Sequence, residues 1–338
     1  MRLSKFVQEP CGLSQELERS SIHVTRGVPR PIRQALETMQ VDSPSRQEWV
    51  IQPRPIQAAY NIYLPGVGRE NCGVPMRAGI PTVTSKDGTK IAYAKVGHGP
   101  VVVLVLGALN SRKSGDSLAK LLASRFTVIS YDRRGRGEST DTVPYAPQRE
   151  VEDLRALIDE IGEPVFLYGH SSGAALALEA AIKLGKQVTK LAIYEAPYGL
   201  DADARKAAKE YDRLLKKLLA SGRKGDAVAL FVRFVGVSDK QVQALRRMSM
   251  WRGLEALAPT LAYDSDILGE GHSLPTALLA GITTPTLVMH GGAGTPSMRD
   301  AARAISEAIP WAQFRTIANQ KHGVSPKVLA PVLADFFE

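Results

Sequence analysis

The sequence is poor in cysteine and contains no long apolar run. Its 338 residues include only two cysteines, Cys11 and Cys72, which are too few for a disulfide framework and form no zinc-ligand pattern with histidine. No stretch approaches the roughly 18 apolar residues that a membrane-spanning helix needs. The first residues, MRLSKFVQEP, lack the apolar segment of a secretory signal. These absences predict a cytoplasmic protein without a membrane span or a bound metal.

Motifs for binding nucleotides or nucleic acids are also missing. No G-x-G-x-x-G or Walker loop lies between a predicted strand and a predicted helix, so we expect no nucleotide cofactor, and no other cofactor is implied. The formal net charge is +9, but a basic surplus without a binding motif indicates solvated helix faces rather than nucleic acid. We therefore expect the partner to be a small molecule.

The chain changes character near residue 76. Residues 1–75 carry scattered prolines and glycines, as in GVPRPIR and LPGVG, without a period of 2 or 3.6 residues. From Met76 the pattern becomes regular, and Asp87-Gly88 supplies a hairpin turn between two alternating segments. The sequence therefore predicts an irregular N-terminal extension, residues 1–75, and a folded domain, residues 76–338.

Apolar strands alternate with amphipathic helices from about residue 81 onward, which indicates an α/β fold with a mostly parallel central sheet flanked by helices. Residues 199–280 interrupt the alternation. They are helical in pattern and predict a cap inserted between two strands. Strands are predicted at 101–106, 126–131, 165–168, 190–194, 286–290 and 313–317, and helices at 150–161, 173–184, 297–309 and 326–337.

One motif points to covalent catalysis. Residues 169–173, GHSSG, form a G-x-S-x-G sequence between a predicted strand and a predicted helix. A sharp turn there lifts the hydroxyl of Ser171 clear of the sheet, and the two glycines permit close packing. A helix that begins at this turn can stabilise negative charge. Ser171 is the predicted nucleophile.

With this motif in place, the chain from about residue 85 resembles the α/β-hydrolase family. Leu106-Gly107-Ala108 resembles the turn that supplies an oxyanion-hole amide. DRRGRGES, residues 132–139, resembles the family loop D-x-x-G-x-G-x-S. His322, in QKHGVSP before the last helix, matches the catalytic histidine, and residues 199–280 match the variable helical cap. The resemblance covers about three quarters of the chain and implies an α/β-hydrolase fold.

The residues support the same roles. A serine hydroxyl needs a nearby imidazole to accept its proton, and only His322 among the six histidines follows the last predicted strand. The backbone amides of Ser172 and Ala108 are the predicted oxyanion hole, with Leu109 as the alternative to Ala108.

The third member of the triad departs from the family pattern. Family members usually carry an aspartate three residues after the glycine that ends the strand at 286–290, where this chain has Gly294. We expect Glu195, at the end of the strand at 190–194, to be the acid that orients His322, and Asp264 in the cap is the alternative. Zearalenone lactonases and some haloalkane dehalogenases are similar in placing a glutamate at that strand end.

The cap is expected to set the specificity. Its apolar residues predict a hydrophobic pocket above the serine, lined by Phe231, Phe234, Met248, Trp251 and Tyr263. We therefore predict a serine hydrolase of the carboxylesterase or lactonase type, acting through an acyl-enzyme on a hydrophobic ester or lactone. Alternatives on the same fold are a cofactor-free perhydrolase, an acyltransferase, a carbon–carbon bond hydrolase and a non-catalytic binding module.

Overall fold

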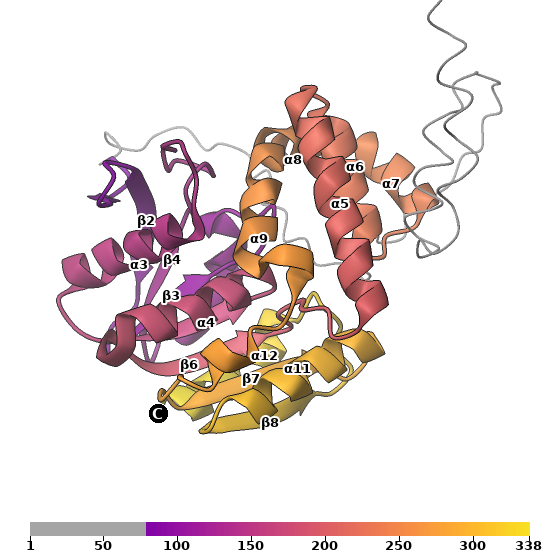
Figure 1. Ribbon diagram of the computed structural model, residues 1–338. Helices are drawn as coiled ribbons and strands as arrows, with labels where there is room; N and C mark the ends of the chain where they lie inside the picture. The colour runs from indigo at the N-terminus through magenta and orange to yellow at the C-terminus, as the bar shows by residue number, and fades with distance from the viewer. Residues whose placement is uncertain (1–78) are drawn as a thin grey trace, which may run out of the picture.

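Eight strands form one sheet in the computed structural model, which describes residues 79–338 (Figure 1). The order across the sheet is β1-β2-β4-β3-β5-β6-β7-β8. β1 and β2 pair antiparallel, β2 pairs antiparallel with β4, and every later pair is parallel. The strands are β1 (Thr82–Thr84), β2 (Lys90–Val96), β3 (Val101–Val105), β4 (Thr127–Tyr131), β5 (Val165–His170), β6 (Val188–Tyr194), β7 (Thr286–Gly291) and β8 (Ala312–Ile317). The predicted mostly parallel sheet is confirmed, while the predicted extension, residues 1–75, lies outside the described residues.

Helices cover both faces of the sheet because successive strand residues point to opposite sides. In β3, Val101, Val103 and Val105 belong to the apolar cluster that includes residues of α3, α4 and α11, whereas Val102 and Leu104 belong to the cluster that includes residues of α2 and α12. These five helices are α2 (Asp116–Leu122), α3 (Pro147–Ile161), α4 (Ser172–Leu184), α11 (Pro296–Ala308) and α12 (Pro326–Phe337). The continuous apolar run of β3 is therefore explained by burial on both of its faces.

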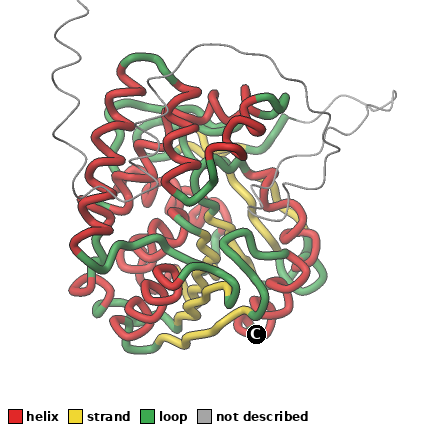
Figure 2. The backbone as a smooth tube through the Cα atoms, turned by 90° about the vertical axis from the view of Figure 1, so that its right-hand side faces the viewer, coloured by secondary structure: helices red, strands yellow, loops and turns green. Residues whose placement is uncertain are grey.

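The segment 199–280 forms a helical cap between β6 and β7. Figures 1 and 2 show its longer helices gathered on one side of the sheet. The cap helices are α5 (Ala202–Ala220), α6 (Lys224–Phe234), α7 (Asp239–Arg246), α8 (Trp251–Leu257), α9 (Leu261–Leu268) and α10 (Thr276–Leu279). They enclose an apolar cluster of their own. The two ends of the cap meet where the Gly199 amide donates to the His272 carbonyl over 2.7 Å.

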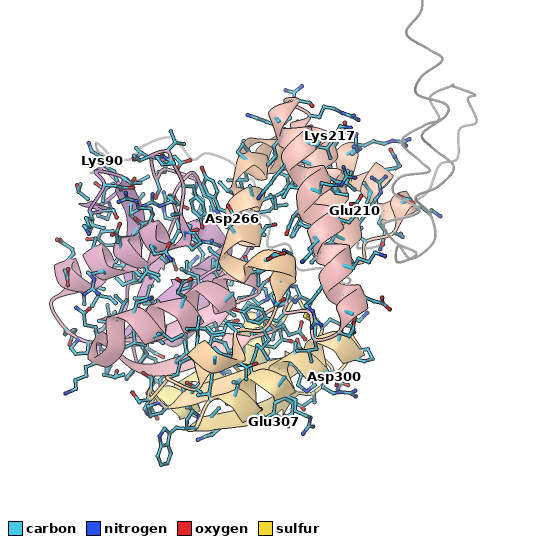
Figure 3. The ribbon with its side chains drawn as sticks, in the orientation of Figure 1. Lys90, Glu210, Lys217, Asp266, Asp300 and Glu307 are labelled. Carbon is cyan, nitrogen blue, oxygen red and sulfur yellow. The ribbon has the colours of Figure 1, made fainter. Side chains whose placement is uncertain are left out.

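Charged residues fall into a solvated group and a buried group. Lys217 and Glu210 of α5 lie on the outside of the cap (Figure 3), as expected for an amphipathic helix. The arginines of the DRRGRG segment differ, because Arg133, Arg134 and Arg136 are only 2%, 0% and 1% exposed. Each forms an ion pair with a buried carboxylate. A buried charge is tolerated only when it is paired in this way.

Candidate active site

The GHSSG segment makes a sharp turn from β5 into α4. Ser171 is the junction residue, with φ 58° and ψ −128°. Few residues other than glycine adopt a positive φ, and this strained geometry is typical of the turn that presents a nucleophilic serine. A Cβ on Gly173 would lie 2.2 Å from the carbonyl oxygen of Val105. Glycine is therefore required where the start of α4 crosses β3.

An imidazole and a carboxylate meet beside this turn. His322 lies in the loop between β8 and α12, and its Nδ1 is 2.8 Å from Oε2 of Glu195. The other oxygen of Glu195 accepts a hydrogen bond from the Gly291 amide over 2.8 Å. Burial favours a higher pKa for Glu195, but the hydrogen bond and charge of His322 and the Gly291 amide outweigh it, so the pKa lies below its usual value. Glu195 is thus held ionised against the ring.

The space around Glu195 explains why the chain carries glycine where family members carry aspartate. A Cβ on Gly294 would lie 3.0 Å from Oε1 of Glu195. Glu195 itself is 1% exposed and has a positive φ of 48°. The Glu195 carboxylate, just after β6, thus occupies the space beside Gly294, in the loop after β7. A larger side chain at position 294 would have to displace it.

His170 and Tyr194 hold the loop that carries His322. Nε2 of His170 donates to the His322 carbonyl over 2.9 Å, and the Tyr194 hydroxyl donates to the Lys321 carbonyl over 2.7 Å. Burial and the nearby charge of His322 lower the pKa of His170 to about 4. His170 is therefore neutral at physiological pH. Its position inside the GHSSG motif ties the turn directly to the loop that bears His322.

Asp264, the alternative acid, belongs to a different network. Its carboxylate accepts two hydrogen bonds from Arg136, at 2.8 and 2.9 Å, and one from Arg133 at 2.8 Å. The Ser172 hydroxyl also donates to it, over 2.7 Å. Burial favours a higher pKa for Asp264, but the two arginines hold it below its usual value. The structure therefore pairs Asp264 with permanent cations and with the Ser171 turn, rather than giving it the place of Glu195.

The turn after β3 approaches the serine closely. A Cβ on Gly107 would lie 2.8 Å from Cβ of Ser171. The carbonyls of this turn are bound by side chains, since Arg136 donates to the Gly107 carbonyl and Asn110 donates to that of Ala108. Ala108 and Ser172 line the cavity with Ser171. Leu109, the alternative donor, has φ 57° and packs into the apolar cluster of the cap.

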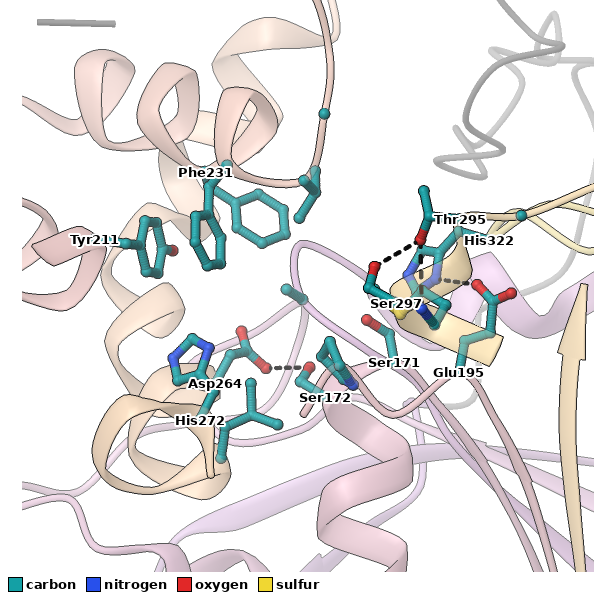
Figure 4. Close-up of a pocket in the computed structure, with 18 of the residues that line it drawn as sticks. Ser171, Ser172, Glu195, Tyr211, Phe231, Asp264, His272, Thr295, Ser297 and His322 are labelled. Carbon is teal, nitrogen blue, oxygen red and sulfur yellow. Dashed lines mark hydrogen bonds and ion pairs between the residues drawn. The ribbon is translucent and has the colours of Figure 1, made fainter. Parts of the chain in front are cut away.

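One cavity of about 490 Å³ brings these groups together with the cap (Figure 4). Ser171, Glu195 and His322 line it, as do Phe231 and Phe234 from the predicted pocket set. Other lining residues were not indicated by the sequence pattern. Tyr211 and His272 line the cavity from the cap. Thr295 and Lys321 line it from the loops after β7 and β8, and Ser297 lines it from the start of α11. The helical period marks Tyr211 as buried, but it does not indicate which neighbour buries it.

Three predicted pocket residues do not line this cavity. Met248 is 41% exposed, and Trp251 is buried inside the cap, where its indole donates to Glu255. Tyr263 stacks on Tyr145 with ring centroids 3.8 Å apart. Trp251 and Tyr263 belong to α8 and α9, whereas Met248 lies in the turn between α7 and α8. An apolar composition predicts burial, but the direction of each face depends on how the cap helices pack.

A family model described as the alpha/beta hydrolase family matches residues 98–331, which is more than half of the chain. The chain belongs to this family. A solved alpha/beta hydrolase from Sphaerobacter thermophilus DSM 20745 is 47% identical and covers 76% of this chain and 100% of that chain, with a TM-score of 0.70. Membership in a family of hydrolases supports an enzymatic role. Within residues 79–338, no helix combines the length and apolar character needed to cross a bilayer.

Curated relatives match shorter segments. A protein of Mycobacterium tuberculosis named "Probable oxidoreductase EphD" is 39% identical over 99 residues, which are 27% of this chain and 17% of that protein. A Bacillus subtilis protein named "Uncharacterized hydrolase YraK" is 32% identical over 105 residues, or 30% of this chain and 39% of that protein. The chain thus spans less than half the length of either relative.

Proposed function

We propose that this alpha/beta hydrolase is a serine hydrolase that cleaves a hydrophobic carboxylic ester or lactone through an acyl-enzyme. The observation that carries the proposal is the 2.8 Å contact between His322 Nδ1 and Glu195, on the same cavity as the strained Ser171 turn. An ionised carboxylate only accepts hydrogen bonds, so Nδ1 carries the proton and Nε2 is the basic nitrogen. That tautomer suits a base that removes the proton of a serine hydroxyl.

The reaction then follows in two steps. The Ser171 oxygen attacks the substrate carbonyl while His322 takes its proton and passes it to the leaving alcohol. The amides of Ser172 and Ala108 stabilise the negative charge that develops on the carbonyl oxygen. Water, activated by His322, hydrolyses the acyl-enzyme. Throughout, Glu195 keeps the ring oriented and stabilises the imidazolium. With a lactone, the leaving alcohol stays attached to the acyl group, and a hydroxy acid is released.

The cavity supports an uncharged, largely apolar substrate. Phe231 and Phe234 form part of its cap side, and its volume of about 490 Å³ suits a small molecule. The two carboxylates on its walls already have partners, since Glu195 is bound to His322 and Asp264 to two arginines. A hydrophobic acyl or aryl group would bury well against the phenylalanines, whereas a sugar would find few polar partners there.

A serine-directed fluorophosphonate probe and a hydrolysis panel test the proposal. The panel contains p-nitrophenyl esters of increasing chain length and several aryl lactones. The native protein should label and should hydrolyse at least one panel member. Ser171→Ala should abolish labelling and lower turnover on the order of 10⁶-fold, as in other serine hydrolases. Ser172→Ala is the matched control, because alanine keeps the backbone amide.

The competing functions give different results. A non-catalytic binding module would neither label nor hydrolyse any panel member. Labelling at Ser171 without hydrolysis would favour an acyltransferase or a carbon–carbon bond hydrolase, and peracid formation from acetate and peroxide would identify a perhydrolase. Equal losses from Ser171→Ala and Ser172→Ala would remove Ser171 from its proposed role.

A further inference from the structure

The cap contributes a wall of the cavity that takes no part in the two proposed chemical steps. Tyr211 of α5, Phe231 of α6 and His272 of the short 3-10 turn η6 (Glu270–His272) belong to it. In Figure 4, Tyr211 and His272 lie on one side of the cavity and His322 on the other, with Ser171 between them. This wall, called here the distal wall, therefore faces the part of a substrate that is remote from its reacting carbonyl.

His272 is held rigidly in the distal wall. It is 4% exposed and has a positive φ of 50°, which few histidines adopt. Its carbonyl accepts the 2.7 Å hydrogen bond from Gly199 that joins the two ends of the cap. Its ring stands edge-on to Tyr211 and Phe234, at centroid distances of 6.2 and 5.9 Å. A strained backbone that the surroundings maintain is common at ligand sites.

The two ring nitrogens of His272 have different surroundings. Nε2 lies 3.2 Å from Oδ1 of Asp212 on α5. Because an ionised carboxylate only accepts hydrogen bonds, Nε2 carries the proton, and Nδ1 of the neutral ring is an acceptor. Nδ1 has no hydrogen-bond partner among residues 79–338. A buried ring on the cavity thus presents an acceptor that the protein itself leaves to a ligand.

The charges near the distal wall decide which ligand group fits. Asp212 and Asp264 both bring negative charge to this end of the cavity. The guanidinium groups of Arg133 and Arg136 already bind Asp264. A ligand carboxylate would therefore find both of these guanidinium groups already paired, whereas a neutral hydroxyl can donate to Nδ1.

We propose that His272 is a specificity-determining residue. Its Nδ1 accepts a hydrogen bond from a hydroxyl group that a hydrophobic substrate carries at the end remote from the reacting carbonyl. This proposal rests on the proposed hydrolase function, because that function puts the carbonyl at Ser171. The substrate class becomes a hydrophobic ester or lactone with a distal hydroxyl.

The test compares p-nitrophenyl alkanoates with their terminal hydroxyl derivatives at each chain length. The native protein should prefer the hydroxylated ester, in kcat/KM, at the one or two lengths that span the cavity. His272→Phe should lower that preference by about tenfold, because only the hydroxylated ester loses a hydrogen bond, whereas changes in packing act on both esters and cancel in the ratio. Phe231→Leu is the matched control on the same wall, and it should change both esters equally and leave the ratio unchanged.

A second variant distinguishes loss of the hydrogen bond from misfolding of His272→Phe. Glycine adopts a positive φ readily and carries no side-chain acceptor, so His272→Gly should melt cooperatively and still lose the preference. The proposal is overturned if the native protein hydrolyses plain esters but prefers no hydroxylated one. It is also overturned if the preference persists in both His272 variants.

Failure of the hydrolase proposal is distinguishable, because the native protein would then hydrolyse neither ester. In that case calorimetry with plain and hydroxylated amides of the same chain lengths decides the role of His272. Tighter binding of the hydroxylated amide, lost in His272→Gly, supports it, and equal binding overturns it.

Discussion

Two buried carboxylates contact the Ser171 turn and its partner histidine, and their surroundings differ. Glu195 binds the imidazole of His322 and one backbone amide. Asp264 binds two guanidinium groups and the hydroxyl of Ser172. An imidazole gains and loses a proton near neutral pH, whereas a guanidinium stays charged. Both acids are therefore buried and have a lowered pKa, and they differ in their partners. Glu195, bound to an imidazole, is suited to support proton transfer, whereas Asp264, bound to guanidinium groups, joins the cap to the Ser171 turn.

The first and largest test removes the charge of Glu195. Glu195→Gln keeps the size of the side chain and an oxygen for the Gly291 amide, but it no longer stabilises the imidazolium or selects its tautomer. We expect kcat for a p-nitrophenyl ester to fall by about 10⁴-fold, with a cooperative melt close to that of the native protein. Activity within tenfold of native would show that the His322 contact is only structural.

The second test removes the charge of Asp264. Asp264→Asn leaves Arg133 and Arg136 buried with one negative charge fewer, and breaking such a pair costs about 3–5 kcal/mol of unfolding free energy. Urea unfolding at pH 7 measures this loss. Asp266→Asn, on the same helix but solvent-exposed, is the matched control and should change stability little. If Asp264→Asn lowers kcat as much as Glu195→Gln without loss of stability, the comparison between the two acids fails.

The pH dependence of stability sharpens the same comparison. The pKa of Asp264 is lower in the folded protein than in the unfolded chain, where it is about 3.9. Its contribution is therefore fully present above the unfolded pKa and is lost as pH falls through the folded value. The difference in unfolding free energy between the native protein and Asp264→Asn should be constant above about pH 5 and should shrink below about pH 4. A difference that does not change down to pH 3 would contradict the ion-pair explanation.

The smallest effect is expected from Ser172→Ala. The variant loses the 2.7 Å hydrogen bond to Asp264 but keeps the amide that we assign to the oxyanion hole. We expect a loss of about 1–2 kcal/mol in unfolding free energy and a kcat within tenfold of native. Thermal melts and ester hydrolysis measure the two quantities separately. A much larger fall in kcat would mean that the hydroxyl itself positions the turn.

Features of the fold that depend on local sequence pattern could be predicted from the sequence. The alternation of strand and helix patterns predicted the parallel sheet, because the spacing of apolar residues along the chain indicates each type of element. The GHSSG motif predicted a strand–turn–helix junction, and its glycines are where Cβ atoms would collide with neighbouring backbone. Short elements could not be predicted in this way. For example, α2 has only seven residues, so its apolar pattern covers less than two helical turns.

Which residues far apart in the sequence come into contact depends on the tertiary structure. The place beside Gly294 belongs to Glu195 because β6 and β7 are neighbours in the sheet and their carboxyl ends lie side by side. The cavity contains Phe231 and His272 but not Trp251, since packing of the cap helices sets the direction of each apolar face. Local pattern fixes whether a side chain is buried, whereas its partner depends on contacts between segments far apart in sequence, which no short stretch of the chain encodes.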